Sequence, residues 1–422
     1  MYYCTSACGT QLSGVSIMPA NSLAACLSGL ALAIQASSPN AAATPRAAPA
    51  GVVPPAQAPA PPGPFFPSDE AVREFVRPYI EKRQAKGIVV GLVEPDGGRR
   101  VLSFGEAGEG ARPLAASSAF EIGSITKTFT GTVLADMVRR GWVQLDDPVG
   151  KYMPAGVRVP SLNGRQITLL DLATHTSGLP RLPTGYVPPD PSNPYAHFAA
   201  EHLYAFLNRH ELAREPGAKF EYSNLGMGLL GHALARAAGA DSFQTLVADR
   251  VLRPLGMSMT AYGRTAVLSP WMTRGHNQQG AVASYFDVAV LAGAGGLNSN
   301  VTDLMTYLDA NIGEPKSQLE HAMRDAQRFY RPGPAPGAQL GLGWMTRTRG
   351  RLTLVGHNGG TAGYSTYVAF DPNTRAGVVV LANSGDFEYA DKIGRELLDP
   401  DRRPLIAGPA QGAPASTTAE AK

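Results

Sequence analysis

A chain of 422 residues, 44% apolar and 17% charged, is long enough for one large domain or two ordinary ones with a buried core. A net charge of +3, spread over scattered basic residues, argues against nucleic acid as a partner. Cys26 is the last of only three cysteines, so the remainder of the chain offers neither a disulfide framework nor a thiol nucleophile.

Residues 1–43 are predicted to be a signal peptide. Their apolar run, residues 23–35, is too short to span a bilayer, and Ala41-Ala42-Ala43 offers a small-residue cleavage site. No Lys or Arg precedes Arg46, and the segment that ends at Cys26 also resembles a lipoprotein cleavage site. We therefore expect export to the periplasm or the medium and no transmembrane span, and the sequence leaves lipidation open.

Regular structure is expected to begin after a linker. Residues 44–67 are rich in Pro and Ala and cannot form a core. Ser68 is a suitable N-cap for a helix that continues to Ala85 and is stopped by Gly87. Residues 88–94 and 100–104 then predict two strands of a β-hairpin around a Pro-Asp-Gly-Gly turn.

A second helix is predicted to begin at Ser124 and to end before Gly141. Its apolar residues recur every four positions, at Ile125, Phe129, Val133 and Met137. Ser124 and Lys127 are three residues apart, so they share one face of this helix at its N-terminus. A lysine amine there could take the proton of a serine that becomes a nucleophile. Ser-x-x-Lys also occurs by chance, and alone the pair indicates no more than a helix start.

The middle of the chain, residues 143–292, is predicted to be mainly helical with long loops. Helices are expected over residues 201–214 and 225–238, and six prolines make the loop 180–195 irregular. A further helix, capped by Ser299 or Asn300, is expected to reach Asn311.

The C-terminal third returns to strands. They are predicted over residues 352–356, 364–370 and 377–382, before a helix over 390–398 and a disordered tail over 401–422. Strands from both ends of the chain most simply form one antiparallel sheet flanked by helices. This predicts an α+β fold with a sheet lobe (68–122 and 295–400), a mainly helical lobe (123–294) and an active site at their junction.

Two later motifs could complete a site around Ser124. Tyr222 could relay protons, and Asn224 could hold a substrate amide, although taken alone the two residues are better explained as a tyrosine at the rim of the core and a helix cap. His357-Asn358-Gly359-Gly360 ends a predicted strand, where glycines permit close approach of a substrate backbone. The Gly360 and Ser124 N–H groups could then form an oxyanion hole, or the glycines could simply form a turn.

Neither a cofactor nor a metal is predicted. Gly226 to Gly231 match G-x-G-x-x-G, but no strand precedes them and no acidic ribose partner follows. His197 and His202 are spaced one residue too far apart for the inverted zinc-protease motif.

The three motifs, in this order, resemble the serine β-lactamase and penicillin-binding-protein family, most closely its class C branch with DD-peptidase and family VIII-type esterase relatives. Residues 145–152, 169–180, 216–231, 254–257 and 356–372 are similar to this branch as well, and the resemblance covers residues 68–398. It implies the β-lactamase/DD-peptidase fold and cleavage of amide bonds in β-lactams or D-Ala peptides through an acyl-serine intermediate. A small molecule or peptide is the implied partner; the sequence gives no oligomeric state.

The resemblance also implies roles for individual residues. Ser124 matches the acylated nucleophile, Lys127 the lysine that assists it, Tyr222 the general base and Asn224 the residue that binds the substrate amide. His357-Asn358-Gly359 stands where many members have Lys-Thr-Gly, and Gly360 matches an oxyanion donor.

Two positions depart from the pattern. Thr126 replaces a small Ser or Ala, and His357 replaces a lysine that helps to hold a substrate carboxylate. Histidine is mostly uncharged near neutral pH, so recognition of carboxylates is in question. A short-chain carboxylesterase with the same site, and a non-catalytic penicillin-binding module, are the alternative functions.

Overall fold

The computed structural model describes residues 64–82, 85–386, 388–403 and 406. The predicted signal peptide (1–43), most of the predicted linker (44–67) and most of the predicted tail (401–422) lie outside the described residues.

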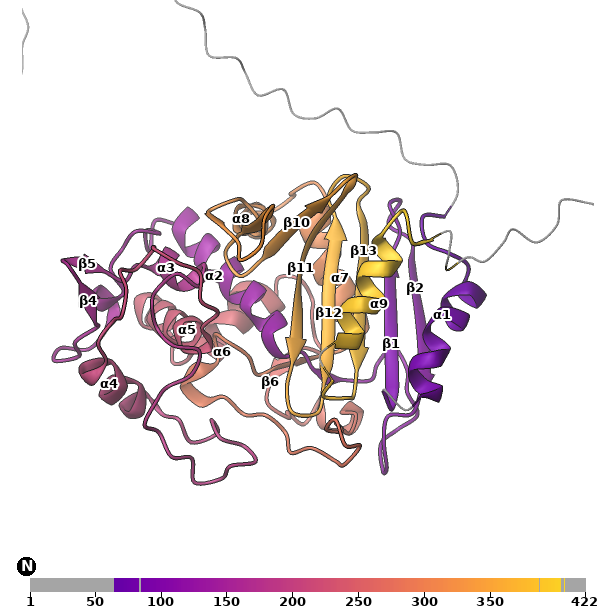
Figure 1. Cartoon of the computed structure of the whole chain (residues 1–422), viewed down its shortest axis with the longest axis horizontal. Helices are drawn as coiled ribbons and strands as arrows, with labels where there is room; N and C mark the ends of the chain where they lie inside the picture. The colour runs from indigo at the N-terminus through magenta and orange to yellow at the C-terminus, as the bar shows by residue number, and fades with distance from the viewer. Residues whose placement is uncertain (1–63, 83–84, 387, 404–405, 407–422) are drawn as a thin grey trace, which may run out of the picture. The chain divides into compact units, whose positions relative to one another are not determined.

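The centre of the fold is an eight-stranded antiparallel sheet with the order β2-β1-β13-β12-β11-β10-β9-β8 (Figure 1). The predicted hairpin is present as β1 (Gly87–Val93) and β2 (Arg99–Gly105). Strand β1 also pairs with the C-terminal strand β13 (Ala376–Ala382). Strand β13 pairs in turn with β12 (Ser365–Asp371), and β12 pairs with β11 (Leu352–Gly360). Strands from the two ends of the chain therefore share one sheet, which confirms the predicted α+β class.

Three strands at the other edge of the sheet were not predicted. They are β8 (Arg331–Pro332), β9 (Ala338–Leu340) and β10 (Met345–Arg349). Strand β10 reads Met-Thr-Arg-Thr-Arg and is largely exposed, so it lacks the apolar alternation by which strands are recognised. Its pairing with β11 creates the strand, and its own sequence contributes little.

The two faces of the sheet are covered by different helices. On β1, Val89 and Val93 belong to one apolar core, whereas Ile88, Val90 and Leu92 belong to the other, as the two-residue period of a strand requires. Helices α1 (Asp69–Glu81) and α9 (Glu388–Leu398) cover the second face, and α7 (Val301–Ile312) covers the first (Figure 1). We call the α7 face the inner face, since Ser124 lies on that side, and the face covered by α1 and α9 the outer face.

The packed domain includes residues that precede its predicted start at Ser68. Ser68 does cap α1, accepting a hydrogen bond from Ala71 N, but the helix ends at Glu81 rather than Ala85. Phe65 and Phe66, assigned to the linker, are buried with α1 and α9 in the core of the outer face. The prediction that order starts at Ser68 was wrong because a Pro-rich composition concealed two adjacent aromatic rings that the sheet can bury.

The predicted tail also has ordered residues at its start. Residues 401–403 and 406 are described, and Arg403 stacks its guanidinium 3.6 Å from the centroid of the Phe65 ring. The segments that flank the domain at its two ends therefore pack against each other on the outer face.

Helix α2 (Thr126–Arg139) is enclosed on every side rather than along one stripe. The four predicted apolar residues are buried, but so are Thr126, Thr128, Thr130 and Thr132. These threonines can be buried because their hydroxyls are satisfied: Thr128 donates to Ile125 O at 2.8 Å and Thr130 to Gly293 O at 2.8 Å. A central helix of this kind holds its first turn rigidly.

The remaining elements lie beside the sheet, mostly on the side where β10 is labelled in Figure 1 and far from β2. Helices α4 and α5 match two predicted helices, the first of which ends five residues early, and the loop 180–195 is irregular as expected. The helices are α3 (Leu169–Ala173), α4 (Ala200–Arg209), α5 (Asn224–Ala238), α6 (Phe243–Val247) and α8 (Gln318–Ala326). Two small sheets contain β3 (Phe120–Glu121), β7 (Leu297–Ser299) and β6 (Ala261–Tyr262), and β4 (Ser161–Leu162) with β5 (Arg165–Gln166).

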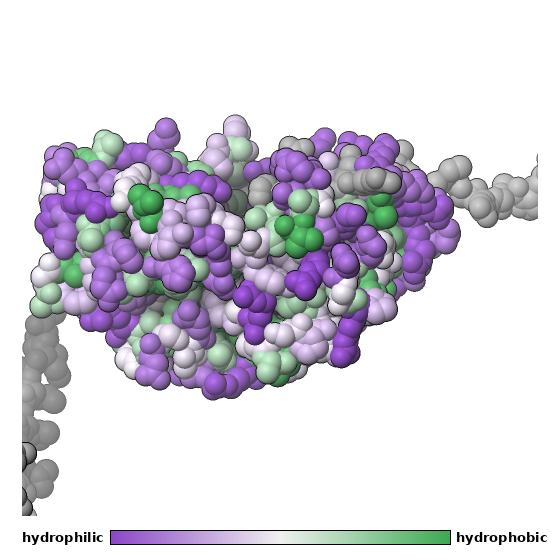
Figure 2. Space-filling model, turned by 90° about the horizontal axis from the view of Figure 1, so that it is seen from below, coloured by the Kyte–Doolittle hydropathy of each residue, from purple (hydrophilic) through white to green (hydrophobic). Residues whose placement is uncertain are grey.

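The face of the molecule seen from below is mostly polar. Figure 2 shows hydrophilic residues over most of one face, with hydrophobic residues in small separate groups. In the part of the chain that the structure describes, no helix is long and apolar enough to cross a membrane.

Candidate active site

Ser124 lies in a tight turn that leads directly into α2. The turn is a short 3-10 helix, η1 (Gly123–Ile125). Gly123 adopts a φ of 50°, and a Cβ there would lie 2.6 Å from Gly360 N, so only glycine lets η1 approach β11 this closely. The serine is thus held at the edge of the sheet, at the N-terminus of a buried helix.

Lys127 is one turn further along and has no exposed surface. Its Nζ donates to Ser124 Oγ at 2.8 Å and to the carbonyl oxygen of Ala294 at 2.6 Å. Burial, followed by the nearby charge of Arg181, lowers the pKa of Lys127 well below its usual range. The predicted contact between amine and hydroxyl is present, and the amine is in a site that favours its neutral form.

Tyr222 reaches the same serine from a different part of the chain. It lies just before α5, whose N-cap Ser223 accepts a hydrogen bond from Gly226 N at 2.8 Å. Ser124 lies near enough to the Tyr222 hydroxyl to lower its pKa, but burial outweighs this effect and raises the pKa of Tyr222 to about 12. Lys127 Nζ is 4.9 Å from the centroid of its ring. Burial therefore disfavours the charged form of both titratable partners of Ser124.

His175 supports Tyr222 and was not among the predicted site residues. Its ring stacks on Tyr222 with centroids 4.4 Å apart, and its Nδ1 accepts a hydrogen bond from Ser223 N. Burial lowers the pKa of His175 well below its usual value, so the ring is a neutral acceptor. Its φ of 56° is rare for a non-glycine residue. The sequence Thr-His-Thr-Ser-Gly carries no spacing from which this contact could be inferred.

Strand β11 forms the opposite wall. We expected the strand to end before His357, but β12 pairs with β11 as far as Gly360, whereas the pairing with β10 stops at Gly356. The last four residues therefore keep one free edge, which meets η1. A Cβ on Gly359 would lie 2.0 Å from Ile122 O, so glycine is required for this contact.

His357 and Asn358 point to opposite faces because they are neighbours in a strand. His357 is buried, its ring centroid lies 6.2 Å from that of Tyr222, and burial lowers its pKa to about 3. Asn358 is exposed and lines a second pocket on the outer face with Tyr367 and Arg395. Of the predicted site residues, Asn358 alone has its side chain outside the cleft, because the motif is a strand and not a turn.

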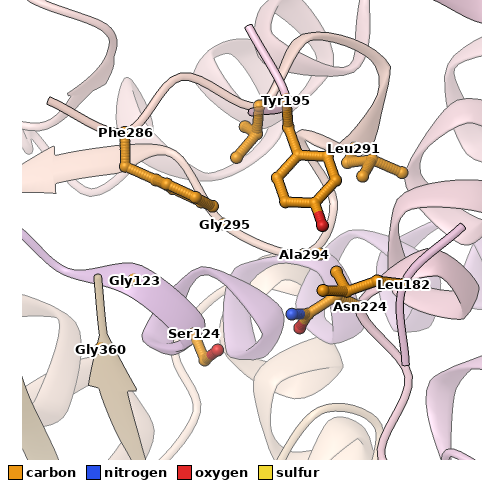
Figure 3. Close-up of a pocket in the computed structure, with 11 residues that line it drawn as sticks. Gly123, Ser124, Leu182, Tyr195, Asn224, Phe286, Leu291, Ala294, Gly295 and Gly360 are labelled. Carbon is orange, nitrogen blue, oxygen red and sulfur yellow. The ribbon is translucent and has the colours of Figure 1, made fainter. Parts of the chain in front are cut away.

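A pocket opens above Ser124 (Figure 3). The side chains of Ser124 and Asn224 point toward one another across its floor, and Tyr195 and Phe286 form its upper wall (Figure 3). Asn224 Oδ1 is buried and has no hydrogen-bond partner among the described residues. The pocket is completed by Gly123, Leu182, Val288, Leu291, Ala294, Gly295 and Gly360.

Glu121 adds a buried carboxyl next to this pocket. Its Oε1 accepts a hydrogen bond from Phe286 N at 2.8 Å, which holds part of the pocket wall. Burial raises the pKa of Glu121 to about 7, against the smaller opposing effects of contacts with Thr361 and Phe286. Its position three residues before Ser124 gave no signal in the sequence. Among the described residues, no group of three or more His, Cys, Asp or Glu is placed to hold a metal ion.

Comparison with known proteins agrees with this geometry. The family model described as Beta-lactamase matches residues 72–399. The chain is 35% identical over 310 residues to the D-alanyl-D-alanine-carboxypeptidase/endopeptidase AmpH of Escherichia coli K12, covering 69% of this chain and 78% of AmpH. It is 27% identical over 361 residues to a β-lactamase of Pseudomonas fluorescens, covering 77% and 95% of the two chains.

A solved structure shares the fold. The β-lactamase/D-alanine carboxypeptidase of Yersinia pestis, in complex with citrate, superimposes with a TM-score of 0.66 at 28% identity, covering 78% of this chain and 98% of that one. The chain belongs to the Beta-lactamase family. It is a serine hydrolase of the class C β-lactamase and DD-peptidase type, as the resemblance in its sequence implied.

Proposed function

We propose that the protein cleaves amide bonds of D-Ala peptides, and is acylated by β-lactams, through an ester on Ser124. The observation that carries this proposal is the contact of Lys127 Nζ with Ser124 Oγ at 2.8 Å in a site without solvent exposure. Relatives named as a D-alanyl-D-alanine carboxypeptidase/endopeptidase and as a β-lactamase support the substrate class.

In the first step, Ser124 Oγ attacks the substrate carbonyl carbon and its proton passes to Lys127. The lowered pKa of Lys127 supports the lysine as the base, since a neutral amine can accept a proton through the same contact. The raised pKa of Tyr222, about 12, disfavours a phenolate as the base. Tyr222 instead passes the proton from Lys127 to the leaving amine as the C–N bond breaks.

The negative charge of the tetrahedral intermediate needs donors near the serine. We assign this role to the backbone N–H groups of Ser124 and Gly360, whose segments are in close contact at Gly123. One such donor typically contributes about 10²–10³ in rate. A water molecule then attacks the acyl ester, the same base takes its proton, and Ser124 is released with the carboxylic acid product.

Asn224 is proposed to bind the amide of the acyl portion. Its Oδ1 is buried, lines the pocket and has no partner among the described residues, so a substrate N–H would satisfy it. His357, Gly359 and Gly360 are proposed to form the wall along which the substrate lies. Asn358 contributes its backbone there and not its side chain.

A short-chain carboxylesterase is the second candidate, and His357 is the observation that favours it. A histidine with a pKa of about 3 is neutral at every working pH, so this position supplies no cation for the carboxylate of a peptide leaving group. An ester with a neutral leaving group does not need one. A non-catalytic module is disfavoured, because Ser124, Lys127 and Tyr222 form a connected set.

Three probes separate these functions: a fluorescent penicillin, an acyl-D-Ala-D-Ala peptide and a p-nitrophenyl ester, each on the wild type and on Ser124→Ala. We expect covalent penicillin labelling and release of D-Ala by the wild type, and neither by the variant. Ester turnover without either signal would favour the esterase. No turnover of any substrate by the wild type would reject both enzyme functions.

We also propose export from the cytoplasm, since peptides that end in D-Ala belong to the cell wall. The apolar run of residues 23–35 supports this proposal. Fractionation of cells that express the full chain, and a chain without residues 1–43, tests it. Retention of both chains in the cytoplasm would contradict it.

A further inference from the structure

The reacting centre contains two buried basic residues, Lys127 and His357. Burial lowers the pKa of Lys127 well below its usual range and that of His357 to about 3. The charged form of each residue is therefore disfavoured, which weakens its attraction for a substrate anion. An exposed cation at the margin of the pocket keeps its full charge and would attract such an anion more strongly.

Arg181 supplies a positive charge at that margin. It is exposed, and its guanidinium carbon lies 5.1 Å from the centroid of the Tyr222 ring. Within the described part of the chain, the guanidinium has neither an ion pair nor a hydrogen bond. The nearby Arg214, in contrast, is paired with Glu221. An arginine is charged at every working pH, so Arg181 remains available to an anion from solution.

The backbone places Arg181 on a defined side of the site. Its carbonyl oxygen accepts hydrogen bonds from Asn224 N at 3.0 Å and Leu225 N at 3.2 Å, and the next residue, Leu182, lines the pocket. The charge of Arg181 also acts on the hydroxyl of Tyr195, which points into the pocket toward Asn224 (Figure 3). Arg181 therefore shares the Asn224 side of the pocket.

We propose that Arg181 is a specificity-determining residue that binds a carboxylate on the acyl portion of the substrate. The proposal rests on the proposed function, in which Asn224 holds the acyl amide and the leaving group lies toward β11. A guanidinium and a carboxylate form two parallel hydrogen bonds, a geometry suited to an anionic side chain or cap beside Asn224. Substrates with an anionic acyl group are then preferred over neutral ones by about tenfold.

Arg181 could instead act only through the base. Its charge is the second cause of the lowered pKa of Lys127, so its removal would raise that pKa and slow every substrate equally at a given pH. The two roles differ in one measurable quantity, which is the ratio of kcat/KM for an anionic and a neutral acyl group. Recognition changes this ratio, whereas an effect on the base leaves it unchanged.

The experiment uses two D-alanyl thioesters with the same neutral thiol leaving group. One carries a glutaryl cap, with a carboxylate, and the other a glutaramide cap. Wild type, Arg181→Gln and Arg181→Lys are compared across pH. Arg209→Gln is the control, because Arg209 is a second arginine at the loop 180–195, where it donates to Thr184 O. Mass spectrometry of Ser124 acylation by the neutral thioester checks the proposed function independently.

We expect a ratio of about ten for wild type and for Arg209→Gln, about one for Arg181→Gln through a higher KM, and an intermediate value for Arg181→Lys. Raising NaCl from 0.05 to 0.5 M should lower the ratio only where the charge is present. A wild-type ratio of one, or an equal loss of both substrates in Arg181→Gln, overturns the inference. Absence of acylation by the neutral thioester would instead reject the proposed function.

Discussion

The two walls of the cleft differ in how their titratable side chains are connected to the serine. On the Ser124 side, Lys127 joins the serine and the Ala294 carbonyl, and Tyr222 rests on His175. On the β11 side, His357 Nε2 is buried without a partner among the described residues. The chemical apparatus is connected on one wall, whereas the other wall retains its backbone but has lost the cation that is usual in the family.

This difference separates reaction from recognition. The groups that move protons form one network, so they constrain one another and define the class of reaction. The ring of His357 lies near the ring of Tyr222 but makes no hydrogen bond with this network among the described residues. We therefore expect its replacement to have little effect on the proton path. The identity of the substrate should therefore respond to changes on the β11 wall and at Arg181, and the rate of acyl transfer to changes around Lys127.

Removal of the base should have the largest effect. Lys127→Met keeps a side chain of similar length in the buried site but cannot accept a proton, so acylation should fall by about 10²–10⁴. The rate of labelling by a fluorescent penicillin measures this loss, and thermal unfolding checks the fold. Lys151→Met, at an exposed lysine paired with Asp147, is the matched control and should label normally. A Lys127→Met rate within tenfold of the wild type would show that Lys127 is not the base.

The pH profile of the wild type gives the same assignment without a mutation. Because the pKa of Lys127 is lowered, the rate of acylation should rise with pH as the amine loses its proton and level off well below pH 10.5. A profile that keeps rising to pH 10.5 would indicate a lysine with an ordinary pKa.

Much of this architecture could be predicted because it depends on short stretches of sequence. The Pro-Asp-Gly-Gly turn predicts the hairpin, Ser68 and Asn300 cap helices as expected, and Ser124 and Lys127 meet because helical spacing brings them together. Each of these features is decided within a few residues.

The rest of the site could not be predicted because it depends on contacts between distant segments. His175 joins the site by stacking on a residue 47 positions away, and Glu121 acquires its raised pKa mainly from burial in the folded protein. The orientation of the Asn358 side chain depends on the continuation of β11 through the motif. This continuation follows from the pairing of β11 with β12. In the sequence alone, two glycines at the end of a strand indicate a turn instead.

Glu121 lies between the two walls, on β3 beside η1, and near Thr361, which follows the end of β11. Its pKa of about 7 exceeds the ordinary 4.5, so the folded protein holds a proton that the unfolded chain has lost. The free energy of unfolding should therefore fall as pH rises from about 4.5 to 7, by up to about 3 kcal/mol, and change little from this group above pH 7.

Glu121→Gln tests this directly. The amide oxygen can still accept from Phe286 N, but nothing titrates, so the decline in stability between pH 5 and 7.5 should be about 3 kcal/mol smaller than in the wild type. Urea unfolding at the two pH values measures it. Glu109→Gln, at an exposed glutamate, should leave the decline as it is. Equal declines in Glu121→Gln and the wild type would show that Glu121 is charged in the folded protein at both pH values.

The smallest predicted effect concerns the missing cation itself. His357→Lys should restore a positive charge facing the leaving group, and raise kcat/KM for an acyl-D-Ala-D-Ala peptide relative to its C-terminal amide by about tenfold. His321→Lys, at an exposed histidine on α8, controls for added charge and should leave this ratio alone. An unchanged ratio in a folded His357→Lys protein would show that this position does not face the leaving-group carboxylate. Because Arg181 acts on the acyl side, the effects of His357→Lys and Arg181→Gln should add in the double variant, each visible only with its own pair of substrates.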